Sequence, residues 1–415
     1  MAKLSMFLPP FAGDYSGACS VLFGLDCLTI IVDASCCTRN YVEYDETRWK
    51  RRRKSTFSAQ LRTIEATLGD DERIVSQIER AVGELGPSCV ALVGTPVPAI
   101  VGMDLDGMAH EVEERCGLPA IGVATTGFDT YEHGASLALR KLVDRFAGAS
   151  SGEGSPASGL CAGSAGTGLR GSDRDGGCGR CGESEGARSQ GARSQGSRPR
   201  ANVLGLTPQD FMSEERMRAV EDAVRAEGFD LAWGTAGDYS LADIERAAHA
   251  DVSFVVAWSG FAAAQLLDKR FGVPYRMGFP LDAGNAAAIL GSGLPAAIGD
   301  DSLVGAAEIL IVHDQVVGGT VRAALRARFG DPVLASEPAL APEPRIAVAS
   351  FFDMNPNMMQ PGDFRIESEA QLIAYLEANP NAAVVGDPLL RRFPGFGGRP
   401  FVPFPHEAVS STLFA

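Results

Sequence analysis

Short apolar runs alternate along the chain with longer segments in which apolar residues recur at helical spacing. Near the N-terminus the runs at residues 29–32 and 89–93 predict buried strands, whereas residues 56–68 and 104–116 predict helices. The same alternation resumes after residue 200 and continues almost to the C-terminus. Strands that alternate with helices of this length indicate parallel sheets, so we expect an α/β fold built from repeated Rossmann-like domains.

One segment interrupts this alternation. From residue 147 to residue 200 the chain consists mainly of Gly, Ser, Ala and Arg, and it contains the pentapeptide Gly-Ala-Arg-Ser-Gln twice in succession. Such a segment cannot bury enough apolar surface to offset the entropy lost on ordering, so it predicts a low-complexity, flexible insertion. The domains we expect are an N-terminal α/β domain at 1–146, the insertion at 147–200, and two further Rossmann-like domains at 201–302 and 303–415.

Composition and charge narrow the class of protein. The chain has 415 residues, 45% of them hydrophobic, which is enough for several cores, and its formal net charge is −15. A protein this acidic is repelled by nucleic acid and by anionic membranes, so neither is an expected partner. No apolar run of about 18 residues predicts a membrane span, and the N-terminus lacks the apolar core of a signal peptide. We therefore expect a cytoplasmic protein.

The nine cysteines are the main candidates for chemistry. Their number is odd and the chain is long, so a disulfide framework is not expected, whereas metal binding or redox chemistry is plausible. Cys36 and Cys37 follow a predicted buried strand, and Cys19 lies in a Gly-containing segment that we expect to be a loop. Thiolates are good iron ligands, although a buried cysteine is more commonly a small apolar core residue. Cys178 and Cys181 have a metal-like spacing but lie in the insertion.

The order of these segments resembles the nitrogenase component 1 family. In that family a cysteine-bearing Gly/Ala loop precedes a strand and a His-Gly-Pro-x-Gly-Cys turn, to which Cys19, residues 29–32 and Cys37 are similar in order. Cys36 stands at the glycine before the family's cysteine, and Pro96 stands where the family has a third ligand cysteine. The other similar segments lie at residues 68–72, 87–104, 122–136, 271–280 and 383–388.

The resemblance implies a nitrogenase-like reductase component that binds an iron–sulfur cluster, with Cys19 and Cys37 as ligands and Cys36 as a further candidate. A [4Fe–4S] cluster usually takes four ligands, so two chains would complete the set. We therefore expect a homodimer, or a heterodimer with a related subunit, in which the cluster bridges the subunits. The resemblance also implies that electrons come from a separate ATP-hydrolysing iron–sulfur protein. This chain has no phosphate-binding loop, so no ATP site is expected on it.

The sequence identifies neither the reduced molecule nor a catalytic acid. Residues 201–415 contain no cysteine, and His249, His313 and His406 have no evident partner there, which favours an organic small-molecule substrate over dinitrogen. Two alternatives stay open. One is a cluster scaffold or maturation protein of the same superfamily that turns over no substrate. The other is a binding module that has kept the fold without the metal.

Overall fold

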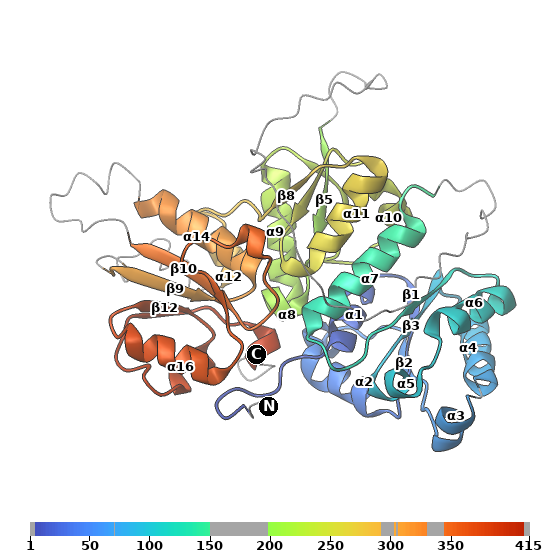
Figure 1. Cartoon of the computed structure of the whole chain (residues 1–415). Coiled ribbons are helices and arrows are strands. Elements are labelled where there is room, and N and C mark those ends of the chain that lie inside the picture. The colour runs from blue at the N-terminus through green and yellow to red at the C-terminus, as the bar shows by residue number, and fades with distance from the viewer. Residues whose placement is uncertain are drawn as a thin grey trace, which may run out of the picture. The chain divides into compact units, whose positions relative to one another are not determined.

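The computed structural model describes residues 5–69, 71–149, 198–291, 303, 306–329 and 344–410. Contacts group Met1–Ala149 with Pro199–Ala415 as one compact unit and Ser150–Arg198 as another, of which only Arg198 is described. Cys178, Cys181 and nearly all of the predicted insertion therefore lie outside the described residues. Within the described part of the chain, no helix is long and apolar enough to cross a membrane. The three parallel sheets in Figure 1 confirm the expected α/β class, whereas the expected domain boundaries stay a prediction.

The first sheet is fully parallel, in the strand order β2-β1-β3-β4. Its strands are β1 (Cys27–Ile31), β2 (Thr56–Ser58), β3 (Cys89–Val93) and β4 (Ala120–Val123). β1, β3 and β4 are buried along their whole length, because helices cover both faces of the sheet, and this explains their continuous apolar runs. The helix predicted for residues 56–68 is wrong in its first part, because β2 forms there and pairs with β1.

Helices pack on the two faces of this sheet. Alternate residues of β1 meet α4 (Glu72–Leu85) and α6 (Leu105–Cys116) in one hydrophobic cluster, and α1 (Asp14–Leu22) and α7 (Tyr131–Phe146) in another. The shorter helices are α2 (Cys36–Asn40), α3 (Thr63–Leu68) and α5 (Pro96–Val101).

The second sheet is parallel in the order β6-β5-β7-β8. Its strands are β5 (Arg200–Leu204), β6 (Asp230–Gly234), β7 (Val252–Val255) and β8 (Tyr275–Met277). Its helices are α8 (Pro208–Phe211), α9 (Glu214–Ala226), α10 (Leu241–Ala247), α11 (Phe261–Phe271) and α12 (Ala286–Leu290). Ser213 and Ser240 start α9 and α10, because each side chain accepts a backbone N–H of the first helical turn.

The third sheet is parallel in the order β11-β10-β9-β12-β13. Its strands are β9 (Glu308–Val312), β10 (Arg345–Ser350), β11 (Phe364–Arg365), β12 (Ala383–Gly386) and β13 (Phe401–Pro403). The helices of this part are α14 (Gln315–Phe329), α16 (Glu369–Ala378) and α17 (Glu407–Ser410). Because the strands of each sheet are parallel, the loops that follow their carboxyl ends gather at one edge of that sheet.

Helices α1 and α7 lie side by side and approach so closely that glycine is needed on both (Figure 1). A Cβ atom on Gly17 would overlap the backbone oxygen of Tyr131, and a Cβ atom on Gly134 would overlap that of Asp14. The expected loop around Cys19 is therefore wrong. The glycine of this segment allows a helix to pack closely, and Cys19 lies within α1.

Candidate functional site

Cys36 and Cys37 lie together on the turn that follows strand β1. Their Sγ atoms are 3.9 Å apart, and Cys36 is exposed while Cys37 is half-buried. The ligand atoms of these two cysteines and of Asp33 all lie within 4.8 Å of one another. Among the described residues, this is the one group of three such side chains that is compact enough to hold a metal ion. We call residues 33–38 the thiol turn.

Asp33 fixes the shape of the thiol turn. Its Oδ2 atom accepts the N–H of Thr38 at 2.8 Å, and its Oδ1 atom accepts the hydroxyls of Ser58 at 2.6 Å and Thr38 at 3.0 Å. The side chain is only 1% exposed. Because both carboxylate oxygens are already used, Asp33 positions the turn, and the sulfurs of Cys36 and Cys37 are left as the available ligands.

The chemistry of this donor pair fits iron. Thiolates are soft, charge-donating ligands of the kind that hold iron–sulfur clusters. Burial and the neighbouring Cys36 raise the pKa of Cys37 to about 12, and a hydrogen bond from Tyr15 opposes this shift. The Cys37 thiol is therefore protonated at neutral pH in the metal-free chain, and a bound cation has to displace that proton.

Cys19 lies inside helix α1 and is not part of the compact group of Asp33, Cys36 and Cys37. Its side chain is 2% exposed and belongs to the hydrophobic cluster against which Cys37 packs. Burial also raises the pKa of the Cys19 thiol well above its ordinary value, which disfavours the thiolate that binds metals. The structure thus brings together Cys36 and Cys37 but leaves Cys19 in the core, and its role as a ligand stays a prediction.

A second polar site consists of three buried side chains, each from the part of the fold that belongs to a different sheet. Tyr131 begins α7, Asp210 lies in α8, and His406 follows β13. The Tyr131 hydroxyl donates to Asp210 Oδ1 and lies 3.1 Å from His406 Nε2, which is 3.5 Å from the same carboxylate oxygen. All three side chains are almost fully buried. We call them the junction cluster.

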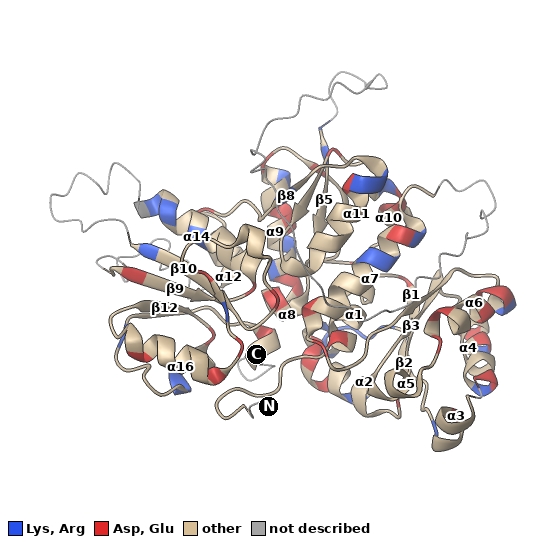
Figure 2. Ribbon diagram, viewed as in Figure 1, with Lys and Arg blue, Asp and Glu red and all other residues tan. Residues whose placement is uncertain are grey.

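His313 and Asp314, which follow β9, extend the junction cluster. The His313 and His406 rings stack with centroids 4.0 Å apart, and burial lowers the pKa of His313 well below its ordinary value. Burial and the nearby Asp210 raise the pKa of Asp314 to about 8. Helices α8 and α17, which are in contact, also carry acidic residues (Figure 2), and burial raises the pKa of Glu407 to about 7. The junction therefore holds protons near neutral pH.

The junction cluster was not predicted from the sequence. His313 and His406 had no evident partner, yet the structure gives His406 two partners, and one of them, Tyr131, is 275 residues away. The space beside the two histidines is filled by Phe351, Phe352 and neighbouring side chains, which leave no room for a water molecule. The one available signal was the position of His313, which directly follows an apolar run that predicts a strand, whereas the strand before His406 was not predicted.

A large cavity, of about 1040 Å³, lies at the carboxyl ends of β10 and β11. The aromatic rings of Phe7, Phe11 and Phe351 line it. The N-terminal residues of the chain form one wall of the cavity. Glu369 holds them in place, because its carboxylate accepts the N–H groups of residues 6–8 at 2.7–3.0 Å.

Residues that line this cavity are close in sequence to residues that contact the thiol turn. Phe11 lines the cavity, and Tyr15, four residues later, donates a hydrogen bond toward Cys37. Between them, Gly13 pairs with Thr130, which also lines the cavity. A short stretch of chain, residues 11–15, therefore connects the lining of the cavity to the surroundings of Cys37.

Comparisons with known proteins bear on the family. Residues 14–300, more than half of the chain, match the sequence profile of the family "Nitrogenase component 1 type Oxidoreductase". The chain is 29% identical over 83 residues to light-independent protochlorophyllide reductase subunit N of Cyanophora paradoxa. It is 28% identical over 97 residues to the nitrogenase iron-molybdenum cofactor biosynthesis protein NifE of Sinorhizobium fredii (strain NBRC 101917 / NGR234). These matches cover 20% and 23% of this chain, and only 18% and 20% of the two relatives.

Solved structures share the fold. A structure described as nitrogenase Cp1 at pH 6.5 has a TM-score of 0.62 and 10% identity, over 98% of this chain and 87% of that chain. Another, nitrogenase Cp1 at pH 5, has a TM-score of 0.52 and 14% identity, over 87% of this chain and 70% of that chain. At these identities the likeness concerns the fold alone. With the profile match across the thiol turn and the first two sheets, this protein belongs to the nitrogenase component 1 type oxidoreductase family.

Proposed function

We propose that this protein is a nitrogenase-like reductase component that holds an iron–sulfur cluster at its thiol turn. The observation that carries the proposal is the pair of sulfurs 3.9 Å apart, one of them exposed, on a turn fixed by the buried Asp33. A [4Fe–4S] cluster, when bound, supplies single-electron transfer. The chain itself contributes the two thiols, the carboxylate that orients their turn, and the Tyr15 hydroxyl beside Cys37.

A second subunit is proposed to complete the ligand set. The thiol turn of one chain offers two thiols, whereas a [4Fe–4S] cluster usually takes four ligands. Large apolar side chains are exposed on neighbouring elements of the first sheet, with Leu68 71%, Ile100 73% and Phe128 69% exposed. Exposed apolar groups of this kind mark surfaces that contact other proteins. The proposed assembly is a homodimer, or a heterodimer with a related subunit, with the cluster between the subunits.

The electron donor and the substrate are assigned by class. The proposed donor is an ATP-hydrolysing iron–sulfur protein, and the proposed substrate is a small organic molecule bound in the 1040 Å³ cavity. The size of the cavity, its aromatic lining and the short stretch of chain that connects it to the thiol turn support this assignment. The name of one relative, a protochlorophyllide reductase subunit, supports reduction of an organic molecule.

A cluster scaffold without turnover is the second candidate. It is favoured by the other relative, which is named as a cofactor biosynthesis protein. The two functions differ in the fate of the cluster. A reductase keeps its cluster while electrons pass, whereas a scaffold gives its cluster to an acceptor protein.

Iron content tests the ligand assignment. Chains with Cys36→Ala or Cys37→Ala are expected to retain less than about a tenth of the iron that the parent chain retains after anaerobic purification, because each thiolate is a direct ligand. Cys116→Ala, at the end of α6, is the matched control and is expected to keep its iron. Cys19→Ala tests the ligand role that the sequence predicts for the buried thiol of α1. Iron and sulfide are measured per chain, together with the visible absorbance and the mass of the assembly.

Two results would overturn the proposal. Full iron in both Cys36→Ala and Cys37→Ala would remove the thiol turn as the cluster site. Loss of iron only in Cys19→Ala would move the site into the core around α1. Incubation of the iron-loaded protein with an apo-acceptor separates the two candidate functions, because cluster transfer without electron delivery indicates the scaffold.

A further inference from the structure

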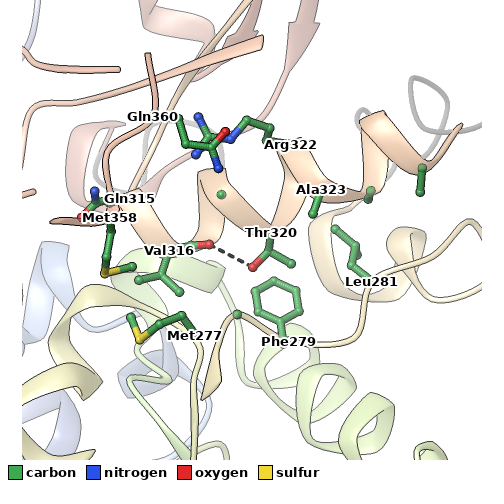
Figure 3. Close-up of a pocket in the computed structure, with 14 residues that line it drawn as sticks. Met277, Phe279, Leu281, Gln315, Val316, Thr320, Arg322, Ala323, Met358 and Gln360 are labelled. Carbon is green, nitrogen blue, oxygen red and sulfur yellow. Dashed lines mark hydrogen bonds between the residues drawn. The ribbon is translucent and has the colours of Figure 1, made fainter. Parts of the chain in front are cut away.

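A separate cavity, of about 410 Å³, lies between the loop after β8 and helix α14. Figure 3 shows Met277 and Phe279 on the loop side and Val316 and Thr320 on the helix side. The cavity shares no lining residue with the larger cavity near the thiol turn. Cavities of this size at the carboxyl ends of parallel strands are common sites for small molecules.

One part of the cavity wall is apolar, and small residues beside it leave room for a ligand. Met277, Phe279, Leu281 and Met358 contribute apolar side chains. On α14 the lining positions at 323, 324 and 327 are alanines, which leave space that larger residues would fill. The Thr320 hydroxyl donates to the Val316 carbonyl at 2.9 Å, so this polar group is already satisfied by its own helix. The part of a ligand that lies against these apolar side chains is therefore expected to be apolar.

One buried charged side chain, that of Arg322, lines the cavity. It is 5% exposed, and its Nη1 donates to Asp363 Oδ1 at 2.6 Å. Asp363 is itself fixed by the backbone N–H groups of Val348 and Gln360, each at 2.8 Å. The guanidinium makes no other hydrogen bond to a described residue, so further N–H groups of this oriented fork remain for a ligand.

The charge around Arg322 favours an anion. Arg326, one helical turn further along α14, donates to the Gln360 side-chain oxygen at 2.8 Å. Helix α14 carries arginines and no acidic residue, as Figure 2 shows. Asp363 accepts one N–H group of Arg322, and a ligand carboxylate would accept the N–H groups that Asp363 leaves. A guanidinium fork held in one orientation matches a carboxylate, with which it forms paired hydrogen bonds.

We propose that this cavity binds a small organic carboxylate with an apolar body. The carboxylate would meet Arg322, and the apolar body would lie against Met277, Phe279 and Met358. This site does not depend on the thiol turn or on the proposed reductase function. Because its walls come from the second and third sheets, a bound carboxylate would join them and stabilise the folded state.

Octanoate and its neutral analogue octanamide are suitable probes, measured by titration calorimetry on the full chain. Octanoate is expected to bind, and octanamide to bind at least about tenfold more weakly, because the amide cannot form a charge-assisted pair. Ala323→Leu fills the cavity without touching Arg322, and it is expected to weaken octanoate binding at least about tenfold. Ala226→Leu, at an exposed position of α9, is the matched control and is expected to leave binding unchanged.

The proposal is overturned if octanoate does not bind, or if octanamide binds as tightly as octanoate. Unchanged octanoate binding in Ala323→Leu would likewise place the site elsewhere. Circular dichroism establishes that each variant is folded. If Ala323→Leu does not fold, Ala327→Leu fills the same cavity from one turn further along α14 and gives the same test.

Discussion

Replacing Gly134 by alanine is expected to lower the free energy of unfolding by more than about 3 kcal/mol, and thus to remove most of the soluble protein. The added Cβ atom would overlap the backbone oxygen of Asp14. Because the obstacle is backbone, no rotamer change relieves it, and α1 has to move away from α7. That movement would open the cluster in which Ala18 packs with Leu139. Urea denaturation and the soluble yield measure the effect.

Gly83→Ala in α4 is the matched control for this substitution. No atom lies within 4 Å of a Cβ atom built at Gly83, and the residue lies within the helix. The same chemical change is therefore expected to stabilise the protein by about 0.5–1 kcal/mol, because alanine loses less backbone entropy in a helix. Equal urea midpoints for Gly134→Ala and the parent chain would show that the close α1–α7 contact is absent.

Raising the pH from 6 to 9 is expected to lower the free energy of unfolding by about 3 kcal/mol. Burial and Asp210 raise the pKa of Asp314 from an ordinary value of 3.8 to about 8. Between these two values the folded state keeps a proton that the unfolded chain has released. Each pH unit in this window therefore removes about 1.4 kcal/mol, and the contribution of Asp314 ends above pH 8. Glu407, with a pKa of about 7, acts in the same direction.

Asp210→Asn is expected to reduce the loss of stability between pH 6 and pH 9. The reason is that the charge of Asp210 is the second cause, after burial, of the raised pKa of Asp314. The amide keeps an oxygen for the Tyr131 hydroxyl and turns its NH₂ group toward the Thr207 hydroxyl. Asp222→Asn, at an exposed position of α9, is the control and is expected to keep the slope of the parent chain. Urea titrations at pH 6, 7, 8 and 9 measure all three proteins. A parent chain whose stability rises over this range would contradict the assignment of a retained proton.

The apolar pattern of the chain was enough to predict the longer strands and the parallel order of their sheets. β1 and β3 are buried on both faces, so nearly every residue is apolar and the run is visible without any tertiary information. It also placed Cys36 and Cys37 beyond the end of β1, where they are found. The order of the motifs was enough to suggest the family that residues 14–300 match. The short strands β2, β8, β11 and β13 were missed because two or three residues give too short a pattern.

The surroundings of the remaining residues depend on how distant elements pack against one another. Gly17 is compatible with a loop or with a close helix contact, and the approach of α7 selects the helix and buries Cys19. Likewise, Tyr131 and His406 meet although 275 residues separate them. A period of two or of 3.6 residues encodes which side of an element faces a core. It does not encode which edges of three separate sheets face one another, and that packing creates the junction cluster.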